Sequence, residues 1–337
     1  MVEILHPTNS ESKKEDTEIS LMPHSSSIDY TNTGWEKINI GEKLPELIKS
    51  AGIDGEILNY IELSGGYFNK VIMTETASEK SVVKISPLWN KGGLARENFA
   101  YSNLKNKSGE LFKLPKIYSY VSEDNKIIPD HEALIREYIE GKKPTDNELD
   151  SEKFHEKIAF SLDSIHSVPM KGYGWLNKEL TGKNNSWHDF LTSIDNLDTT
   201  INSGLLQKND IDWVINKLIN ECDNDFDPVL LYGDLKPENI LIKNGDIYLI
   251  DFENCFSGHK YYDIGIGLSF IPQIWKHLNI YLKEAEQKKA KKQIILYAMR
   301  HAISCLGHRI NIGDRNESTV ATKRFFELKK LYESEES

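Results

Sequence analysis

Short β-branched runs dominate the pattern of apolar and polar positions between residues 34 and 140. The runs EILNYIEL, KVIMTET and SVVKIS are separated by Gly, Asn or Ser, which is typical of a small antiparallel sheet. Residues 44–52 have helical spacing, with Pro near the start and Gly near the end, and residues 93–106 indicate a second helix. Residues 132–144, EALIREYIEGKKP, predict a strand that ends in a Gly-containing turn.

Helical periodicity dominates after Pro144. Residues 151–169 form an amphipathic pattern closed by Pro169, and the stretches SWHDFLTSIDNL, DIDWVINKLINEC and KQIILYAMRHAISCL repeat apolar residues at helical intervals. A single strand pair is expected among these helices. It is indicated by the Asn-Gly between ILIK and DIYLI, because both positions of such a turn adopt positive φ.

The chain therefore divides into three predicted parts. Residues 1–33 are rich in Ser, Thr, Asn, Glu and Lys, so we expect a flexible N-terminal extension. Residues 34–140 form a small β-rich lobe, and residues 141–337 form a larger helical lobe that carries the hairpin. This order indicates an α+β protein, and a crevice between two lobes is a common place for a ligand.

Composition and charge narrow the range of functions. The chain has 337 residues, of which 39% are apolar and 28% charged, as in an ordinary globular protein. Its formal net charge of -11 argues against nucleic acid or an anionic membrane as the main partner, because both bind positive surfaces. A cationic substrate is permitted by this charge.

Cysteines and targeting signals exclude further classes. The three cysteines, Cys222, Cys255 and Cys305, are far apart and form no C-x-x-C pair, which argues against a disulfide framework or a zinc site. The first residues, MVEILHPTNSESKKED, lack the apolar core of a signal peptide. No apolar run reaches the ~18 residues of a membrane span, so we expect a cytoplasmic protein.

The stretch LYGDLKPENILIKNGDIYLIDFE, residues 231–253, carries the candidate chemistry. Asp234 and Asn239 precede the first strand of the predicted hairpin, and Asp251 closes the second strand. Because the two-residue turn brings the strand ends together, Asn239 and Asp251 can reach one ion, and their oxygen atoms suit Mg²⁺. Asp234 is a candidate base, a role that contributes about 10²- to 10⁴-fold in rate.

The spacing of these residues resembles the catalytic loop of kinases, with an Asp base, an Asn metal ligand and a second Asp that opens a D-F-x turn. The chain also contains LSGGYFNKV, SVVKIS, ARENF, REYIEG, GYGWL, SWHDFL and YYDIG. In this order, over residues 60–270, the motifs resemble those of the aminoglycoside phosphotransferase family of small-molecule kinases. The resemblance implies a two-lobed, protein-kinase-like α+β fold, with a small antiparallel β-sheet N-lobe and a mainly helical C-lobe.

The resemblance also implies catalytic roles. Asp234 would be the base toward an acceptor hydroxyl. Asn239 and Asp251 would hold Mg²⁺ on the β- and γ-phosphates of ATP or GTP. Asp263, from YYDIG, would brace the catalytic loop.

A second set of residues would bind the nucleotide in the N-lobe. The set comprises Gly65 and Gly66 in the covering hairpin, Lys84 on the α- and β-phosphates, Glu97 paired with that lysine, and the backbone of Glu137 and Ile139 at the adenine.

Three positions depart from the family pattern. Tyr232 stands where the catalytic loop usually opens with His, and a Tyr can substitute for that His structurally. The covering hairpin has Gly65 and Gly66 instead of G-x-G-x-x-G. Arg136, just before the predicted hinge, is unusual at a position that normally faces the adenine pocket.

Other residues have simpler interpretations. His166 is interpreted as a helix-end residue packed under the catalytic loop rather than as a catalytic histidine. Trp187 and Phe190 are expected in the core rather than on a sugar-binding surface. The acidic runs DNELDSE and ECDNDFD, like the basic run KKAKK, are expected as solvated faces.

The function implied by the resemblance is Mg²⁺-dependent transfer of a phosphoryl group from ATP or GTP to a hydroxyl of a small polar molecule, most plainly an aminoglycoside-type antibiotic. A Ser/Thr protein kinase is one alternative, since DLKPEN is typical of such enzymes. However, DFE replaces D-F-G, and the helices that follow leave no room for a long activation segment. A non-catalytic nucleotide-binding pseudokinase is the other alternative, and Tyr232 is the feature in its favour.

Overall fold

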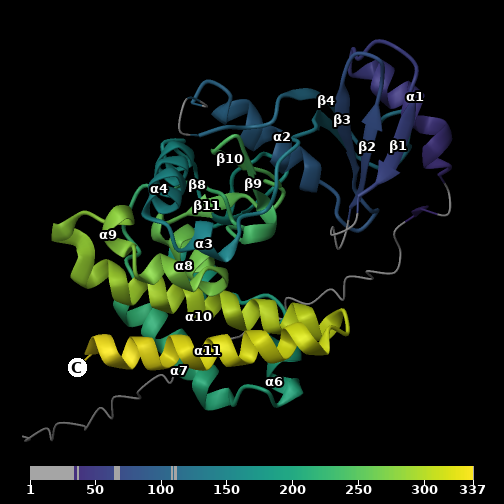
Figure 1. The fold of residues 1–337 in the computed structure, drawn as a ribbon. Coiled ribbons are helices and arrows are strands. Elements are labelled where there is room, and N and C mark those ends of the chain that lie inside the picture. Colours follow the sequence, from purple (N-terminus) through teal and green to yellow (C-terminus); the bar gives the residue numbers. More distant parts are fainter. Residues whose placement is uncertain (1–33, 36–37, 64–68, 108, 110–111, 337) are drawn as a thin grey trace, which may run out of the picture.

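A computed structural model describes residues 34–35, 38–63, 69–107, 109 and 112–336 of the protein (Figure 1). The predicted N-terminal extension and the glycine pair of the covering hairpin lie outside these residues. Figure 1 shows a sheet with its helices at one end of the molecule and a larger, mainly helical part at the other. The predicted α+β, two-lobed architecture is confirmed.

Five antiparallel strands form the N-terminal sheet, in the order β1-β2-β3-β5-β4. The β-branched runs predicted as strands lie in it, and β4 is an additional strand. The strands are β1 (Asn59–Glu62), β2 (Lys70–Glu75), β3 (Lys80–Ile85), β4 (Ile117–Val121) and β5 (Ala133–Glu137).

The two faces of this sheet have different neighbours. One face packs against α1 (Ile40–Ser50) in a separate small core. Directly paired residues of neighbouring strands share a face, and the register pairs Lys84 with Leu134 and Val82 with Arg136. Because side chains alternate along a strand, Lys84 and Arg136 lie together on the face turned away from α1.

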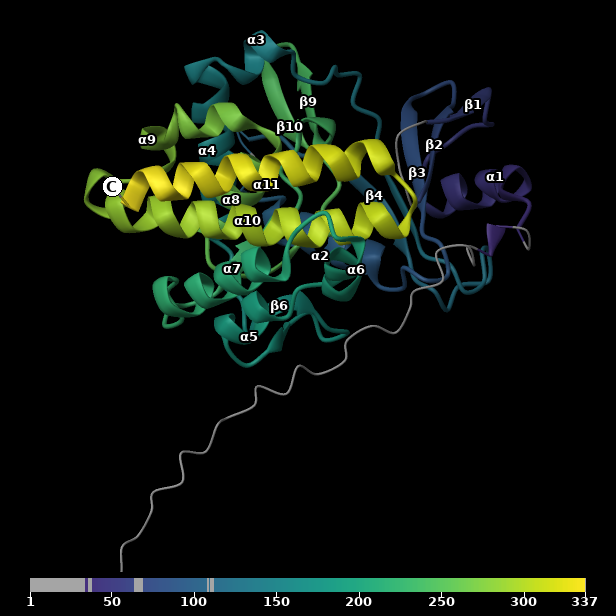
Figure 2. The same cartoon turned by 90° about the horizontal axis from the view of Figure 1, so that it is seen from below.

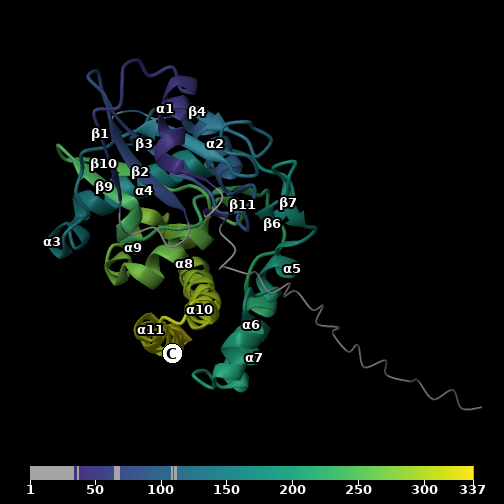
Figure 3. The same ribbon diagram turned by 90° about the vertical axis from the view of Figure 1, so that its right-hand side faces the viewer.

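Helices form most of the remaining chain, and the long α10 packs against α8 and α11. Figures 2 and 3 show α10 and α11 side by side along the helical part. The helices are α2 (Gly93–Leu104), α3 (Asp146–Leu149), α4 (Glu152–His166), α5 (Trp187–Thr192), α6 (Leu197–Ser203), α7 (Lys208–Glu221), α8 (Tyr261–Phe270), α9 (Leu278–Tyr281), α10 (Gln287–Asn311) and α11 (Arg315–Glu336), with 3-10 turns at Pro237–Asn239, Pro272–Trp275 and Glu284–Glu286.

One predicted helix is divided in the structure. SWHDFLTSIDNL reads as a single helix by periodicity, whereas the chain leaves helical geometry at Ser193 and takes a positive φ of 60° at Asn196 before α6 begins. The Ser186 side chain caps the first of the two helices by accepting from the Asp189 amide. Local breaks of this kind override a periodic pattern.

The expectation of a single strand pair in the helical half is wrong. A four-stranded sheet in the order β7-β6-β11-β8 accompanies the hairpin. Its strands are only three or four residues long, and β6, β7 and β11 each contain a Gly, so they carry little periodic signal. They are β6 (Tyr173–Leu176), β7 (Gly182–Asn184), β8 (Val229–Leu231) and β11 (Phe256–Gly258).

The Asn-Gly hairpin is confirmed. Strands β9 (Ile240–Lys243) and β10 (Asp246–Leu249) pair in an antiparallel register, and Asn244 and Gly245 both have positive φ, 53° and 82°. The Ile250 amide donates to the Asn239 carbonyl at 3.0 Å, which continues the pairing just beyond the two strands. The hairpin therefore brings the residues that flank its strands side by side.

Candidate active site

The loop between β8 and β9 carries Asp234 at a nearly buried position, 7% exposed. Its Oδ2 atom accepts from Lys236 Nζ at 2.7 Å and from Asn239 Nδ2 at 2.9 Å, with Asn254 Nδ2 at 3.4 Å. Burial lowers the pKa of Lys236, but the nearby acidic groups, Asp234 first and then Asp251, together raise the pKa above its usual value.

Asp263, at the start of α8, is fully buried beneath this loop. Its Oδ1 accepts from the Gly233 amide, and its Oδ2 accepts from the Tyr232 amide and contacts His166 Nε2, each at 2.8 Å. Gly233 has a φ of 82°, and a Cβ there would lie 2.0 Å from the Asn254 carbonyl oxygen, so only Gly suits the position. Asp263 thus contacts the loop immediately before Asp234.

His166 lies where its interpretation as a helix-end residue under the catalytic loop requires. It is the last residue of α4, and its side chain reaches the loop through Asp263. Trp187 and Phe190 are buried in the core, as expected, and Trp187 Nε1 donates to Tyr297 Oη at 3.0 Å.

Tyr232 joins the two strand ends of the hairpin. Its side chain is fully buried, and its hydroxyl donates to the Ile250 carbonyl, with the Asn239 carbonyl at 3.4 Å. One carbonyl belongs to Asn239, and the other belongs to Ile250, the residue just before Asp251. A buried hydroxyl satisfied by backbone gives Tyr232 a structural place in a position where the family pattern has His.

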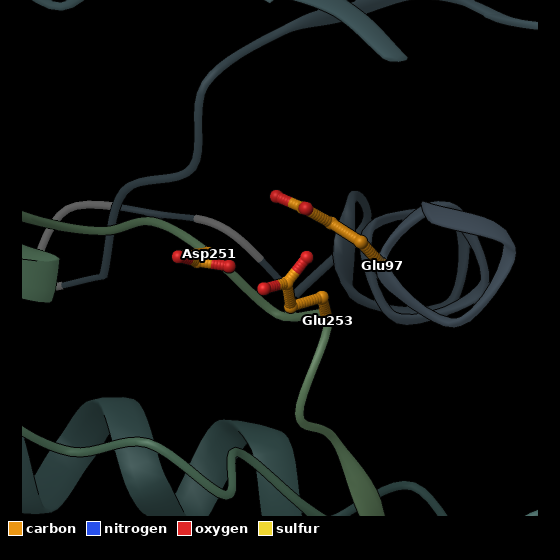
Figure 4. Close-up of side chains that lie close together, drawn as sticks. All are labelled: Glu97, Asp251 and Glu253. Carbon is orange, nitrogen blue, oxygen red and sulfur yellow. The ribbon is translucent and has the colours of Figure 1, made fainter. Parts of the chain in front are cut away.

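Lys84 contacts three acidic side chains, those of Glu97, Asp251 and Glu253. Figure 4 shows these three carboxylates lying close together. Its Nζ atom is 2.8 Å from Glu97 Oε2, 2.7 Å from Asp251 Oδ1 and 3.4 Å from Glu253 Oε2. Burial lowers the pKa of Lys84, but the three carboxylates, Asp251 first, raise it well above its usual value. For Asp251 burial raises the pKa, but the positive charges of Lys84, Lys236 and Arg136 together lower the pKa below its usual value.

Glu253 is a candidate site residue that the sequence analysis does not identify. Its Oε2 accepts from Asn69 Nδ2 at 2.6 Å, and its backbone carbonyl accepts from Arg96 Nε at 3.0 Å. Asn69 precedes β2 and Arg96 lies in α2, so Glu253 connects the larger lobe with two elements of the N-terminal lobe. Burial raises its pKa to about 6. One feature of the sequence could have identified Glu253. It is the third residue of DFE, at the position where the D-F-G motif of kinases has a glycine and therefore no side chain.

The donor atoms present suit a magnesium ion. Asn239 uses its Nδ2 to donate to Asp234, which leaves its amide oxygen to act as a ligand. Asp251, whose backbone φ is +67°, uses Oδ1 for Lys84 and keeps a second carboxylate oxygen. Glu97, Asp251 and Glu253 also offer oxygen atoms within 4.8 Å of one another, but the Lys84 ammonium already contacts all three groups. Oxygen donors of this kind are those that Mg²⁺ prefers.

The predicted base-binding segment begins at Glu137, the last residue of β5. The Glu137 carbonyl accepts from Arg136 Nη1 at 3.2 Å, and the Ile139 carbonyl accepts from the Gly141 amide at 2.8 Å. Arg136 itself is only 8% exposed. Arg136, which has no explanation in the sequence, therefore lies directly at the predicted hinge.

A family model described as the phosphotransferase enzyme family (APH) matches residues 59–293, well over half of the chain. The protein belongs to this family. A search of curated proteins found no significant match.

Solved structures with the same fold include three kinds of small-molecule kinase. A thermostable mutant of aminoglycoside phosphotransferase APH(4)-Ia, in complex with ADP and hygromycin B, is 15% identical, with a TM-score of 0.65 over 84% of this chain and 96% of that one. A putative fructosamine-3-kinase from Haemophilus somnus 129PT is 17% identical, with a TM-score of 0.60 over 89% and 99%. Choline kinase LicA from Streptococcus pneumoniae is 16% identical, with a TM-score of 0.59 over 88% and 100%.

These similarities establish the kinase-like fold for this chain. In the part of the chain that the structure describes, no helix is both long enough and apolar enough to span a membrane.

Proposed function

We propose that this protein is a magnesium-dependent small-molecule kinase, which transfers the γ-phosphoryl group of ATP or GTP to a hydroxyl of a small polar acceptor. In this proposal residues 34–140 form the nucleotide-binding lobe and residues 141–337 form the catalytic and substrate-binding lobe. The single observation that carries the proposal is that Lys84, paired with Glu97, also contacts Asp251 at 2.7 Å, across the two lobes. This is the arrangement required to place a triphosphate beside a metal ligand.

The reaction would form a bond between the acceptor oxygen and the γ-phosphorus and break the bond from that phosphorus to the β–γ bridging oxygen. The nucleoside diphosphate would leave with the electron pair, and the acceptor proton would pass to Asp234. Lys84 would orient the α- and β-phosphates, while Asp263 and Tyr232 would keep the loop of Asp234 in place. Asn239 and Asp251 would hold Mg²⁺, which neutralises charge on the phosphates in such reactions.

An aminoglycoside-type antibiotic is the first acceptor to test. The family membership, the hygromycin B complex of a structural neighbour and the net charge of -11 support this choice. The same neighbours make choline and a fructosamine the next acceptors. The proposal places the enzyme in the cytoplasm, with no nucleic acid or membrane as a partner.

The connection after Asp251 argues against a protein kinase. Strand β11 pairs with β6 and β8, and α8 begins at Tyr261, ten positions after Asp251. A short connection built into a sheet leaves no separate segment for binding a peptide substrate. Small acceptors therefore suit this fold better.

The proposal is tested by incubating the protein with Mg²⁺, γ-labelled ATP or GTP and a panel of aminoglycosides, macrolides, choline and fructosamine. Transfer of label to one or more of these molecules is expected. Transfer only to a generic protein substrate would favour the protein-kinase alternative. Nucleotide binding without transfer to any acceptor would favour the pseudokinase.

A further inference from the structure

Arg136 is a buried cation on the nucleotide-facing side of the N-terminal sheet. It pairs across the sheet with Val82 and shares a face with Lys84, opposite the face that packs on α1. Only 8% of its surface is exposed. A guanidinium at such a depth needs hydrogen-bond acceptors, because burial without partners is costly.

The partners of Arg136 are incomplete. Its Nη1 donates to the Glu137 carbonyl at 3.2 Å, whereas its Nε has no hydrogen-bond partner among the described residues. The same holds for two other buried atoms, Tyr101 Oη and Glu97 Oε1. Native proteins rarely leave such groups unpaired, so these three atoms, on α2 and β5, indicate a polar partner that the described residues do not supply.

The electrostatics place these groups near one another. Burial and the Glu97 carboxylate raise the pKa of Tyr101, whereas the charges of Arg136 and Lys84 lower it. Arg136 also acts on Asp251, where burial raises the pKa and Lys84, together with Arg136, lowers it. Arg136 and Tyr101 are therefore close enough to interact electrostatically, and Arg136 lies on the side of the sheet that carries Lys84, the region assigned to the nucleotide in the proposed function.

The hydrogen bond between Arg136 and the Glu137 carbonyl bears on which purine base can bind at the predicted hinge. The Glu137 carbonyl is the predicted acceptor for the 6-amino group of adenine, but Arg136 Nη1 already donates to it. A base edge at this point would meet a guanidinium, which has only donors. Both purines present the N7 acceptor at this edge, but adenine places its 6-amino donor beside it, whereas guanine places a second acceptor, O6, and Arg pairs with O6 and N7 together.

We propose that Arg136 makes this protein selective for nucleotides with a 6-oxopurine base, so that GTP rather than ATP is its phosphoryl donor. This inference rests on the proposed function and narrows its nucleotide. Arg136 would be a specificity-determining residue, with its fork directed at O6 and N7 of the base.

The test measures nucleotide binding by calorimetry in Mg²⁺, which requires no acceptor. GDP is compared with ADP, with IDP, which keeps the 6-oxo group but lacks the 2-amino group, and with 7-deaza-GDP, which lacks the N7 acceptor. We expect GDP to bind about 10- to 100-fold more tightly than ADP, the range that one bidentate Arg–guanine contact provides. IDP should bind much as GDP does, and 7-deaza-GDP should bind more weakly.

Two variants separate recognition from structure. Arg136→Met should bring the GDP and ADP affinities close together, while Lys116→Met, which removes an exposed positive charge from the chain segment beside the hinge, should keep the ratio of the unmodified protein. A merely structural Arg136 would weaken both nucleotides equally and leave the ratio unchanged. The comparison of GDP, IDP and 7-deaza-GDP uses the unmodified protein and holds even if Arg136→Met does not fold.

The outcomes distinguish this inference from the proposed function. ADP binding as tightly as GDP, or an unchanged ratio in Arg136→Met, would overturn the role of Arg136 and leave the kinase proposal intact. Binding of neither nucleotide would overturn both.

Discussion

The proposed catalytic loop, residues 232–239, and the proposed nucleotide-facing wall, formed by Glu97, Tyr101 and Arg136, hold their polar groups in opposite ways. In the loop, Asp263 accepts from two backbone amides, and the Tyr232 hydroxyl lies on two backbone carbonyls. On the wall, one polar atom each of Glu97, Tyr101 and Arg136 has no partner among the described residues. A loop that holds a catalytic base in position pairs its buried polar groups within the protein. A surface that binds a ligand keeps some hydrogen-bonding groups unpaired, and the ligand can pair with them. The contrast predicts that mutations in the loop change stability and rate together, and that mutations on the wall change binding.

The largest effect is expected at the base. Asp234→Asn keeps the shape of the side chain but removes the proton acceptor, so turnover should fall by about 10²- to 10⁴-fold. Initial rates with the best acceptor measure this change, with nucleotide affinity as a second readout that should stay similar. Asp212→Asn, an exposed carboxylate on α7, is the matched control. Full turnover by Asp234→Asn would remove the base assignment.

Asp263→Asn should show how much the hydrogen bonds between Asp263 and the loop contribute to the free energy of unfolding. An amide group can accept only through one atom, so at least one of the buried amides of Tyr232 and Gly233 would lose its acceptor. We expect the free energy of unfolding to fall by about 1–3 kcal/mol, measured by urea denaturation. Asp163→Asn, on the exposed side of α4, should leave it unchanged. Equal stability of the two variants would contradict the account of the loop.

Tyr232→Phe removes only the hydroxyl between the strand ends. The Ile250 carbonyl then loses its donor, and we expect a loss of about 1 kcal/mol in the free energy of unfolding. The Mg²⁺ concentration required for half-maximal turnover should rise, because Asn239 and Asp251 flank these strand ends. Tyr232→His provides the comparison with the usual family residue. Unchanged stability and Mg²⁺ dependence in Tyr232→Phe would show that the hydroxyl has no such role.

The smallest expected effect is the pH dependence contributed by Glu253. Because burial raises its pKa to about 6, the folded protein keeps a proton that the unfolded protein, with the usual value of 4.5, has lost. The contribution of Glu253 to the free energy of unfolding therefore falls as pH rises from 4.5 to about 6. Glu253→Gln should remove this part of the dependence, as measured by denaturation at several pH values. Parallel pH curves for the variant and the unmodified protein would contradict the prediction.

Local signals in the sequence predict the hairpin and most helices. Asn244 and Gly245 determine the turn by their own conformational preferences, so the positions of Asn239 and Asp251 follow from the chain nearby. The Lys84–Glu97 pair follows from family resemblance and is present at 2.8 Å.

Features that depend on distant contacts could not be predicted in this way. The short strands β6 and β8 pair with β11, which lies well beyond each of them along the chain. Glu253 becomes a site residue through contacts of its carboxylate with Lys84 and with Asn69, which is 184 positions away. Arg136 likewise has no explanation until the sheet places it on the same face as Lys84.

The position of Lys84 has a consequence for the order in which charges enter the site. Three carboxylates meet a single ammonium there, so a bare polyphosphate would add anions to a surplus of anions. A triphosphate that arrives already chelated to a dication brings its own compensation. We therefore expect the pocket to discriminate against free nucleotide electrostatically, before any hydrogen bond to the base is formed.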